Sequence, residues 1–244
     1  MIFDLDGTLV QTEKLKAVSY ARAAIELCPQ ELNEDEVLEA FKEVVGLPRS
    51  EVAQQLVDRF QLQEKAAERM SEYGVDTPWQ AYIQVRLSHY EKMLADPEVL
   101  LKHQWPHNMA VLDMARANQC STGLATMSRC QQATRVLEIL ELQEAFDFVA
   151  TRDDVETGKP DPEIYRLVAS ELEIPADECL VLEDSPSGVE AAVSAGMWCI
   201  AMTTPFTHLG VHKQGLLPPE WIVDDPGQVL VMVERMLEER RLDD

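Results

Sequence analysis

The sequence has few cysteines, few basic residues and no long apolar run. Its five cysteines are odd in number and form no Cys-x-x-Cys pair, which favours reduced thiols over a disulfide framework. No apolar stretch approaches the ~20 residues of a membrane span, and no charged segment followed by an apolar one precedes Asp4. We therefore expect an intracellular, cytoplasmic chain that does not enter a membrane; an organellar location stays open because a targeting segment could have been removed.

The scarcity of positive charge limits the classes of partner. Lys and Arg number 21 against 44 Asp and Glu, for a formal net charge of −23 in 244 residues. So negative a chain is poorly suited to nucleic acid or to an anionic membrane surface. A small phosphorylated substrate is still compatible, because the field at a binding site is local.

The first motif is the segment Asp4-Leu5-Asp6-Gly7-Thr8, preceded by three apolar residues. In a strand, Asp4 and Asp6 would share a face, and Gly7 ends the strand. Leaving the strand at Gly7, the chain can place the second carboxylate over the first, so that Asp4 attacks phosphorus and Asp6 moves protons. The carboxylates also attract a hard divalent cation, and we expect Mg²⁺.

A second apolar run ends at Thr126, followed by Met127 and Ser128 before a helical segment. A phosphate there would meet the Thr126 hydroxyl, the amides of Met127 and Ser128 and a helix N-terminus. We expect these residues and Gly7 to bind the phosphoryl group.

Two further segments complete a possible phosphoryl-transfer site. Lys159 lies between Gly158 and Pro160 in a stiff loop, from which its ammonium group can reach into a cleft and offset phosphate charge. The apolar run 179–182 ends in Glu183 and Asp184, which are the natural remaining metal ligands.

These four segments, in this order, resemble the four motifs of the haloacid dehalogenase-like superfamily over residues 1 to about 205. The resemblance implies that Asp4 is the nucleophile that becomes an aspartyl phosphate and that Asp6 is the general acid and base, with its backbone carbonyl facing Mg²⁺. It implies that Thr126 and Lys159 hold the transferring group. The implied metal ligands are Asp4, Asp6, Glu183 and Asp184.

Residues 12–96 differ in character, because their apolar positions follow only helical spacing. We expect a cap of four or five helices inserted into a core made of residues 1–11 and 97–244. Such an insertion resembles the β-phosphoglucomutase-like branch of the superfamily. Gly46-Leu47-Pro48-Arg49 resembles the branch's Gly-x-x-Arg, which implies a substrate-binding role for Arg49; Arg86 falls near a second basic position of that kind.

The remaining core alternates between the two kinds of secondary structure. We expect further strands at 146–150, 198–202 and 221–223, and helices at 106–118, 129–140, 161–172, 187–195 and 227–240. This alternation predicts an α/β fold with a doubly wound parallel sheet, and the site should lie at the carboxyl ends of its strands.

His208 and His212 have the spacing of metal ligands on a helix. Gly210 interrupts the segment, however, and the neighbouring sequence shows no third ligand. We therefore expect no zinc site there.

The function favoured by the motifs is a Mg²⁺-dependent phosphatase acting on a small phosphorylated metabolite, such as a sugar phosphate, as a monomer or weak homodimer. A β-phosphoglucomutase-like phosphomutase is the alternative, although Lys16 stands where that mutase has a histidine. A phosphoaspartate signalling module is less favoured because Asp6, as an acid and base, would shorten the life of the acyl phosphate.

Overall fold

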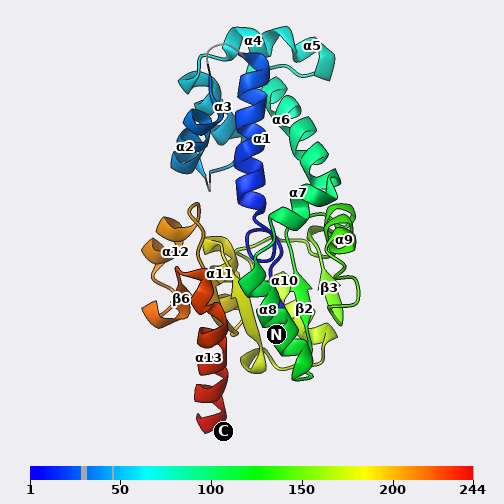
Figure 1. Ribbon diagram of the computed structural model, residues 1–244, viewed down its shortest axis with the longest axis vertical. Helices are drawn as coiled ribbons and strands as arrows, with labels where there is room; N and C mark the ends of the chain where they lie inside the picture. The colour runs from blue at the N-terminus through cyan, green and yellow to red at the C-terminus, as the bar shows by residue number, and fades with distance from the viewer. Residues whose placement is uncertain (29–31, 46, 244) are drawn as a thin grey trace. The chain divides into compact units, whose positions relative to one another are not determined.

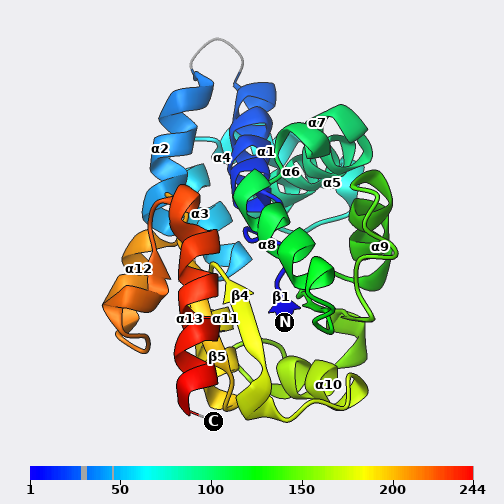
Figure 2. The same cartoon turned by 60° about the horizontal axis from the view of Figure 1, so that its bottom comes forward.

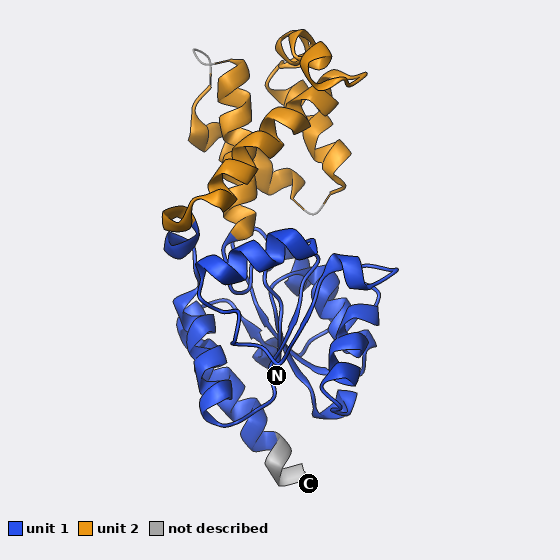
Figure 3. Ribbon diagram, turned by 90° about the vertical axis from the view of Figure 1, so that its right-hand side faces the viewer, with its two compact units in different colours: residues 1–11, 100–244 blue, residues 12–99 orange. Residues whose placement is uncertain are grey.

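The computed structural model describes residues 1–28, 32–45 and 47–243, with side chains up to residue 239. The chain divides into two compact units (Figure 3). The first comprises Met1–Gln11 and Leu100–Asp244, and the second comprises Thr12–Val99.

The first unit is built on a six-stranded sheet in the order β3-β2-β1-β4-β5-β6, in which all neighbouring strands are parallel. The strands are β1 (Ile2–Phe3), β2 (Gly123–Ala125), β3 (Phe148–Ala150), β4 (Leu180–Glu183), β5 (Trp198–Met202) and β6 (Ile222–Val223). The strands β2 and β3 follow on one side of β1, and the strands β5 and β6 follow on the opposite side, beyond β4. The carboxyl ends of β1 and β4 therefore flank a topological switch point, the usual place for a ligand site in such sheets.

Helices cover both faces of the sheet, which confirms the doubly wound α/β fold. Helices α8 (Pro106–Ala117) and α13 (Val229–Asp243) pack together over one face (Figure 2). Helices α10 (Glu163–Glu171) and α11 (Pro186–Ser194) pack on the strands from the other side. The remaining elements are α9 (Cys130–Ile139), α12 (His208–Gln214) and the short 3₁₀ turns Arg152–Asp154, Ala176–Glu178, Pro219–Trp221 and Pro226–Gln228.

The apolar stripe of α10 shows why these helices form and where they pack. Ile164, Tyr165, Val168 and Ala169 are buried at helical spacing. Gly123 of β2 lets this stripe come close, because a Cβ atom there would lie 2.3 Å from Cγ1 of Val168.

Helix α12 differs from expectation, since it runs from His208 to Gln214 through Gly210 without interruption. The glycine has a packing reason. A Cβ atom at Gly210 would lie 2.7 Å from Cγ of Pro186, at the start of α11. Gly210 therefore allows α12 to pack closely against α11.

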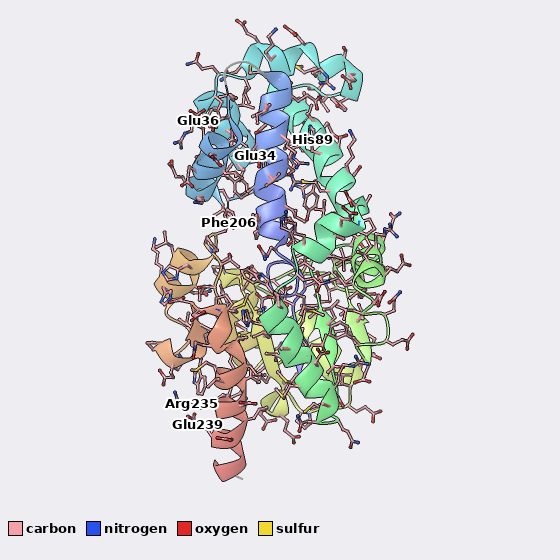
Figure 4. All side chains as sticks on the ribbon, in the orientation of Figure 1. Glu34, Glu36, His89, Phe206, Arg235 and Glu239 are labelled. Atoms are coloured by element: carbon pink, nitrogen blue, oxygen red, sulfur yellow. The ribbon has the colours of Figure 1, made fainter. Side chains whose placement is uncertain are left out.

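Helix α13 has a solvated outer face. Arg235 Nε donates to Glu239 Oε1 at 2.7 Å, one turn further along the helix (Figure 4). The guanidinium of Arg235 also lies over the ring of Trp221, 5.4 Å from its centre.

The second unit is all-helical within its described residues (Figure 1). It contains α1 (Thr12–Leu27), α2 (Glu34–Val44), α3 (Arg49–Arg59), α4 (Gln63–Glu68), α5 (Met70–Tyr73), α6 (Pro78–Ala95) and the start of α7 (Pro97–Lys102). Six helices lie wholly within it instead of four or five, because α4 and α5 are too short to show a periodicity in sequence. Helices α1 and α6 form its centre, where the buried Tyr82 hydroxyl donates to the carbonyl oxygen of Tyr20 at 2.8 Å.

Of the helices in the described ranges, none combines the length and the apolar character that crossing a membrane requires.

Candidate active site

The acidic loop that follows β1 lies at the switch point. Asp4 continues the β1–β4 pairing, since its amide donates to the carbonyl oxygen of Leu182 at 3.1 Å. Gly7 then turns the chain with φ of +97°. A Cβ atom at Gly7 would lie 2.2 Å from Oδ2 of Asp184, so both the turn and the close approach of this carboxylate require glycine.

Lys159 links the strands that carry the acids. Its ammonium group donates to Asp4 Oδ1 at 2.7 Å and to Glu183 Oε1 at 2.6 Å. A third bond, of 3.0 Å, goes to the carbonyl oxygen of Ala125 at the end of β2. The lysine side chain is 3% exposed, so these three acceptors replace water entirely.

Glu183 has a different role from its neighbour Asp184, as its hydrogen bonds show. Its Oε1 accepts from Lys159 and from the Tyr165 hydroxyl, the latter at 2.9 Å. Its Oε2 accepts from the Asp184 amide and from the amide and hydroxyl of Ser185. These five bonds use both oxygens, so the geometry favours Glu183 as the group that positions Lys159.

For each of these groups, burial and the charge of its ion-pair partner act on the pKa in opposite directions. Burial raises the pKa of Asp4 to about 7, because it outweighs the attraction of Lys159, and the charges of Glu183 and Asp6 add to the rise. Burial also opposes ionisation of Glu183, but the Lys159 ammonium and the Ser185 amide outweigh it and keep the pKa of Glu183 low. The pKa of Lys159 is raised: burial lowers it, but the charges of Asp4 and Glu183 outweigh that effect.

Asp6 is held by the loop that follows β2. Its Oδ2 accepts from the Thr126 hydroxyl at 3.0 Å and from the Ser128 hydroxyl at 2.7 Å. The Ser128 amide donates to the Thr126 hydroxyl oxygen at 3.0 Å. Met127, expected to offer an amide to phosphate, places its side chain toward Gly158, where a Cβ atom would lie 2.8 Å from its Cε.

A divalent cation fits the carboxylates at this edge. Asp4, Glu183 and Asp184 are all buried, and a ligand oxygen from each lies within 4.8 Å of the others. With Asp6, whose charge acts on Asp4, they make four acids, of which two are bonded to Lys159, and such an excess of negative charge is costly to bury. Carboxylate oxygens are the ligands that Mg²⁺ prefers, and because Glu183 is fully bonded, Asp4 and Asp184 fit best as side-chain ligands.

Tyr165 and Ser185 are further residues of the candidate site, bonded to Glu183, that the sequence motifs did not single out. The Tyr165 ring also lies beneath Lys159, whose Nζ is 4.8 Å from the ring centre. The available signal was a tyrosine in the apolar stripe of a helix, since a buried hydroxyl needs a hydrogen-bond partner. Nothing in the sequence identified that partner as Glu183.

The two arginines expected to bind substrate both belong to the second unit. Arg49 is exposed at the first position of α3, and Gly46 of its motif lies outside the described residues. Arg86 of α6 is 4% exposed and stacks on two rings, 5.0 Å from the centre of Tyr20 and 4.4 Å from that of Tyr90. Burial lowers the pKa of Arg86, and the positive charge of Arg49 lowers it further.

Comparisons with known proteins agree with a phosphoryl-transfer site. The family model described as haloacid dehalogenase-like hydrolase matches residues 1–202. A phosphorylated carbohydrates phosphatase of Thermotoga maritima is 31% identical over 81% of each chain. A validoxylamine A 7'-phosphate phosphatase of Streptomyces hygroscopicus is 30% identical, covering 83% of this chain and 84% of the relative.

A solved structure is similar over nearly the whole length. It is a candidate β-phosphoglucomutase of Thermotoga maritima, with a TM-score of 0.70, 25% identity and coverage of 96% of this chain and 97% of that one. The chain therefore belongs to the haloacid dehalogenase-like hydrolase family, and it is a phosphoric monoester hydrolase of that type. Both the family and the fold expected from the motifs are confirmed.

The pKa of Asp4 gives a prediction for metal binding. Only the ionised carboxylate binds a cation, so Mg²⁺ affinity should be lost as the pH falls through about 7, the pKa of Asp4 without metal. From pH 8 to pH 6 the affinity should fall about tenfold. Isothermal titration calorimetry in buffers of different ionisation enthalpy measures both the affinity and the proton released. Asp113→Asn, which changes an exposed acid on α8, should keep this dependence, and an affinity that is equal at both pH values would contradict it.

Proposed function

We propose that this protein is a Mg²⁺-dependent phosphatase that hydrolyses a small phosphorylated metabolite, a sugar phosphate in particular, through an aspartyl phosphate on Asp4. The observation that carries the proposal is the placement of Asp4 beside both a buried ammonium group and Asp6. One carboxylate is bonded to Lys159, and the other is held by Thr126 and Ser128.

In the first half-reaction an oxygen of Asp4 attacks phosphorus and the bond from phosphorus to the ester oxygen breaks. Protonated Asp6 gives its proton to the departing alcohol. Lys159 offsets charge on the transferring group, and Thr126 and Ser128 keep Asp6 oriented. Mg²⁺ held by Asp4 and Asp184 would supply charge neutralisation between carboxylate and phosphate.

In the second half-reaction Asp6, now ionised, removes a proton from water while the water oxygen attacks phosphorus. The bond between phosphorus and Asp4 breaks, and the products are inorganic phosphate, free Asp4 carboxylate and protonated Asp6. The same residue thus acts as acid and then as base, and the cycle ends in its starting protonation state.

We further propose that the second unit is a cap that selects the substrate and that the core is the first unit. Arg86 supports the proposal that the second unit is a cap. Within the described residues no carboxylate forms an ion pair with its buried guanidinium, which lies against two tyrosine rings. The charge of Arg49 acts on both Arg86 and Tyr20, so the two arginines share one region of the unit. Paired cations of this kind suit a phosphate or a polyhydroxylated anion.

The Thermotoga maritima relative supports a sugar phosphate, because phosphorylated carbohydrates are the substrates that its name gives.

Replacement of the two loop acids tests the mechanism. Asp4→Asn should lower the rate of phosphate release from an aryl phosphate at least about 10³-fold, because an amide oxygen is a poor nucleophile. Asp6→Asn should lower turnover about 10²- to 10⁴-fold, since it removes the proton transfer. The measurement is phosphate release with and without Mg²⁺, with Asp113→Asn as the matched surface control. Turnover in Asp4→Asn near that of the native protein would reject the assignment.

Arg86→Gln tests the cap. It should raise KM for sugar phosphates at least about tenfold, because a charge-assisted hydrogen bond is lost, while the KM for a small aryl phosphate changes little. Arg22→Gln on the exposed surface of α1 is the matched control, and thermal unfolding monitors the integrity of both variants. Equal effects on both substrate types would show that Arg86 acts on the structure of the cap instead of on the substrate.

A phosphomutase is the second candidate, favoured by the similarity to the candidate β-phosphoglucomutase. It would use the same aspartyl phosphate but pass the phosphoryl group to another hydroxyl of the sugar. We expect release of inorganic phosphate to exceed interconversion of hexose phosphates when a hexose bisphosphate is supplied. Phosphorus NMR follows both reactions in one sample. Interconversion without phosphate release would establish the mutase in place of the hydrolase.

A further inference from the structure

Two histidines of the first unit, one helical turn apart, meet an aspartate from another element beyond the ends of β5 and β6. His208 Nδ1 lies 3.0 Å from Asp224 Oδ1. His212 Nε2 lies 3.0 Å from the same oxygen and 3.1 Å from Oδ2. Asp224 is the residue after β6, and both histidines are on α12 (Figure 1).

These groups have the composition of a transition-metal site. One ligand atom from each of His208, His212 and Asp224 lies within 4.8 Å of the others. Ligand atoms around a tetrahedral Zn²⁺ at about 2.0 Å lie about 3.3 Å apart, so small side-chain adjustments suffice to bring them onto one ion. Imidazole nitrogens suit Zn²⁺, Cu²⁺ and Ni²⁺, whereas the acids beside Lys159 suit a hard cation.

The surrounding structure holds the ligands in place. The Thr203 hydroxyl, directly after β5, donates to Asp224 Oδ1 at 2.7 Å, which orients the carboxylate in the manner of an outer-shell partner. Gly210 fixes α12 against Pro186, so the two histidines, one turn apart, face the end of β6. The two histidine rings contact each other at a tilt of 55°, with their centres 4.4 Å apart.

The three candidate ligands are accessible to solvent. The side chains of His208, His212 and Asp224 are 46%, 39% and 48% exposed, so an ion from solvent reaches them without unfolding and water can fill a remaining coordination position. A surface network of two imidazoles on one carboxylate is the alternative arrangement.

We propose that His208, His212 and Asp224 form a second metal site, for Zn²⁺ or a similar borderline transition metal, separate from the carboxylates around Lys159. Bound metal would connect α12 to the end of β6. This site differs from the expectation drawn from sequence, because the third ligand comes from the next strand of the sheet instead of from the neighbouring residues.

Titration with Co²⁺, a spectroscopic substitute for Zn²⁺, tests the proposal in the full chain. Saturating Mg²⁺ is present so that the carboxylates around Lys159 prefer the hard ion. We expect one visible absorption band typical of a site with imidazole ligands, displaced by one equivalent of Zn²⁺, and a Zn²⁺-dependent rise in the thermal unfolding temperature. His212→Asn and Asp224→Asn should each weaken Zn²⁺ binding more than about tenfold, since each removes a direct ligand.

His107→Asn is the matched control, because it removes an exposed histidine at the start of α8 and should leave the Co²⁺ band unchanged. Circular dichroism shows that each variant is folded. A band that persists in both His212→Asn and Asp224→Asn would place the metal elsewhere and overturn the proposal, as would the absence of any Zn²⁺ effect on the native protein.

Discussion

One buried ammonium group among carboxylates is the interaction on which the rest of this site depends. Lys159 is almost fully buried and bonds at once to Asp4, Glu183 and the carbonyl oxygen at the end of β2. Taking such charges out of water is costly, and their mutual attraction repays the cost only when the geometry is good and every remaining lone pair is satisfied. Glu183 meets this condition through Tyr165 and Ser185, which leaves Asp4 as the acid whose charge remains poorly balanced.

That imbalance explains why the site suits phosphoryl transfer. A buried acid whose charge is balanced only in part, by an ammonium group that it shares with Glu183, attracts a divalent cation, and the cation in turn allows a phosphate dianion to approach. The sheet provides the arrangement at little conformational cost, because the parallel order puts the ends of β1, β2 and β4 next to one another. Gly7 then lets the acidic loop close against Asp184, at a distance that no side chain would permit.

The sequence predicted groups that belong to short local motifs, most of them directly after a strand. Asp4, Asp6, Thr126, Lys159 and Asp184 could be recognised because each belongs to a local motif, and the parallel sheet brings those motifs together. Tyr165 could not be assigned, because its partner Glu183 is 18 residues away and the pairing depends on how α10 packs on the sheet. The short helices α4 and α5 were not predicted for a different reason, since four to six residues are too few to reveal a period of 3.6 residues.

The cluster on α12 shows the same limit of sequence-based prediction. The sequence reveals the spacing of His208 and His212, but Asp224 joins them only because β6 pairs with β5 and ends beside the helix. Gly210 appeared to interrupt the helix, whereas its actual role is to admit Pro186. The low helix propensity of glycine, taken alone, predicted a helix break here, and this was wrong because tertiary packing determines the structure at this position.

The most direct test of the central claim is to identify the residue that carries the phosphoryl group during turnover. Acid quenching after rapid mixing with substrate and Mg²⁺, followed by proteolysis at low pH and mass spectrometry, would locate it. We predict a peptide that contains Asp4, with the mass of one phosphoryl group added at Asp4 and lost on treatment with base or hydroxylamine. A phosphoryl group on any other residue, or steady turnover with no phosphoenzyme at any mixing time, would contradict it.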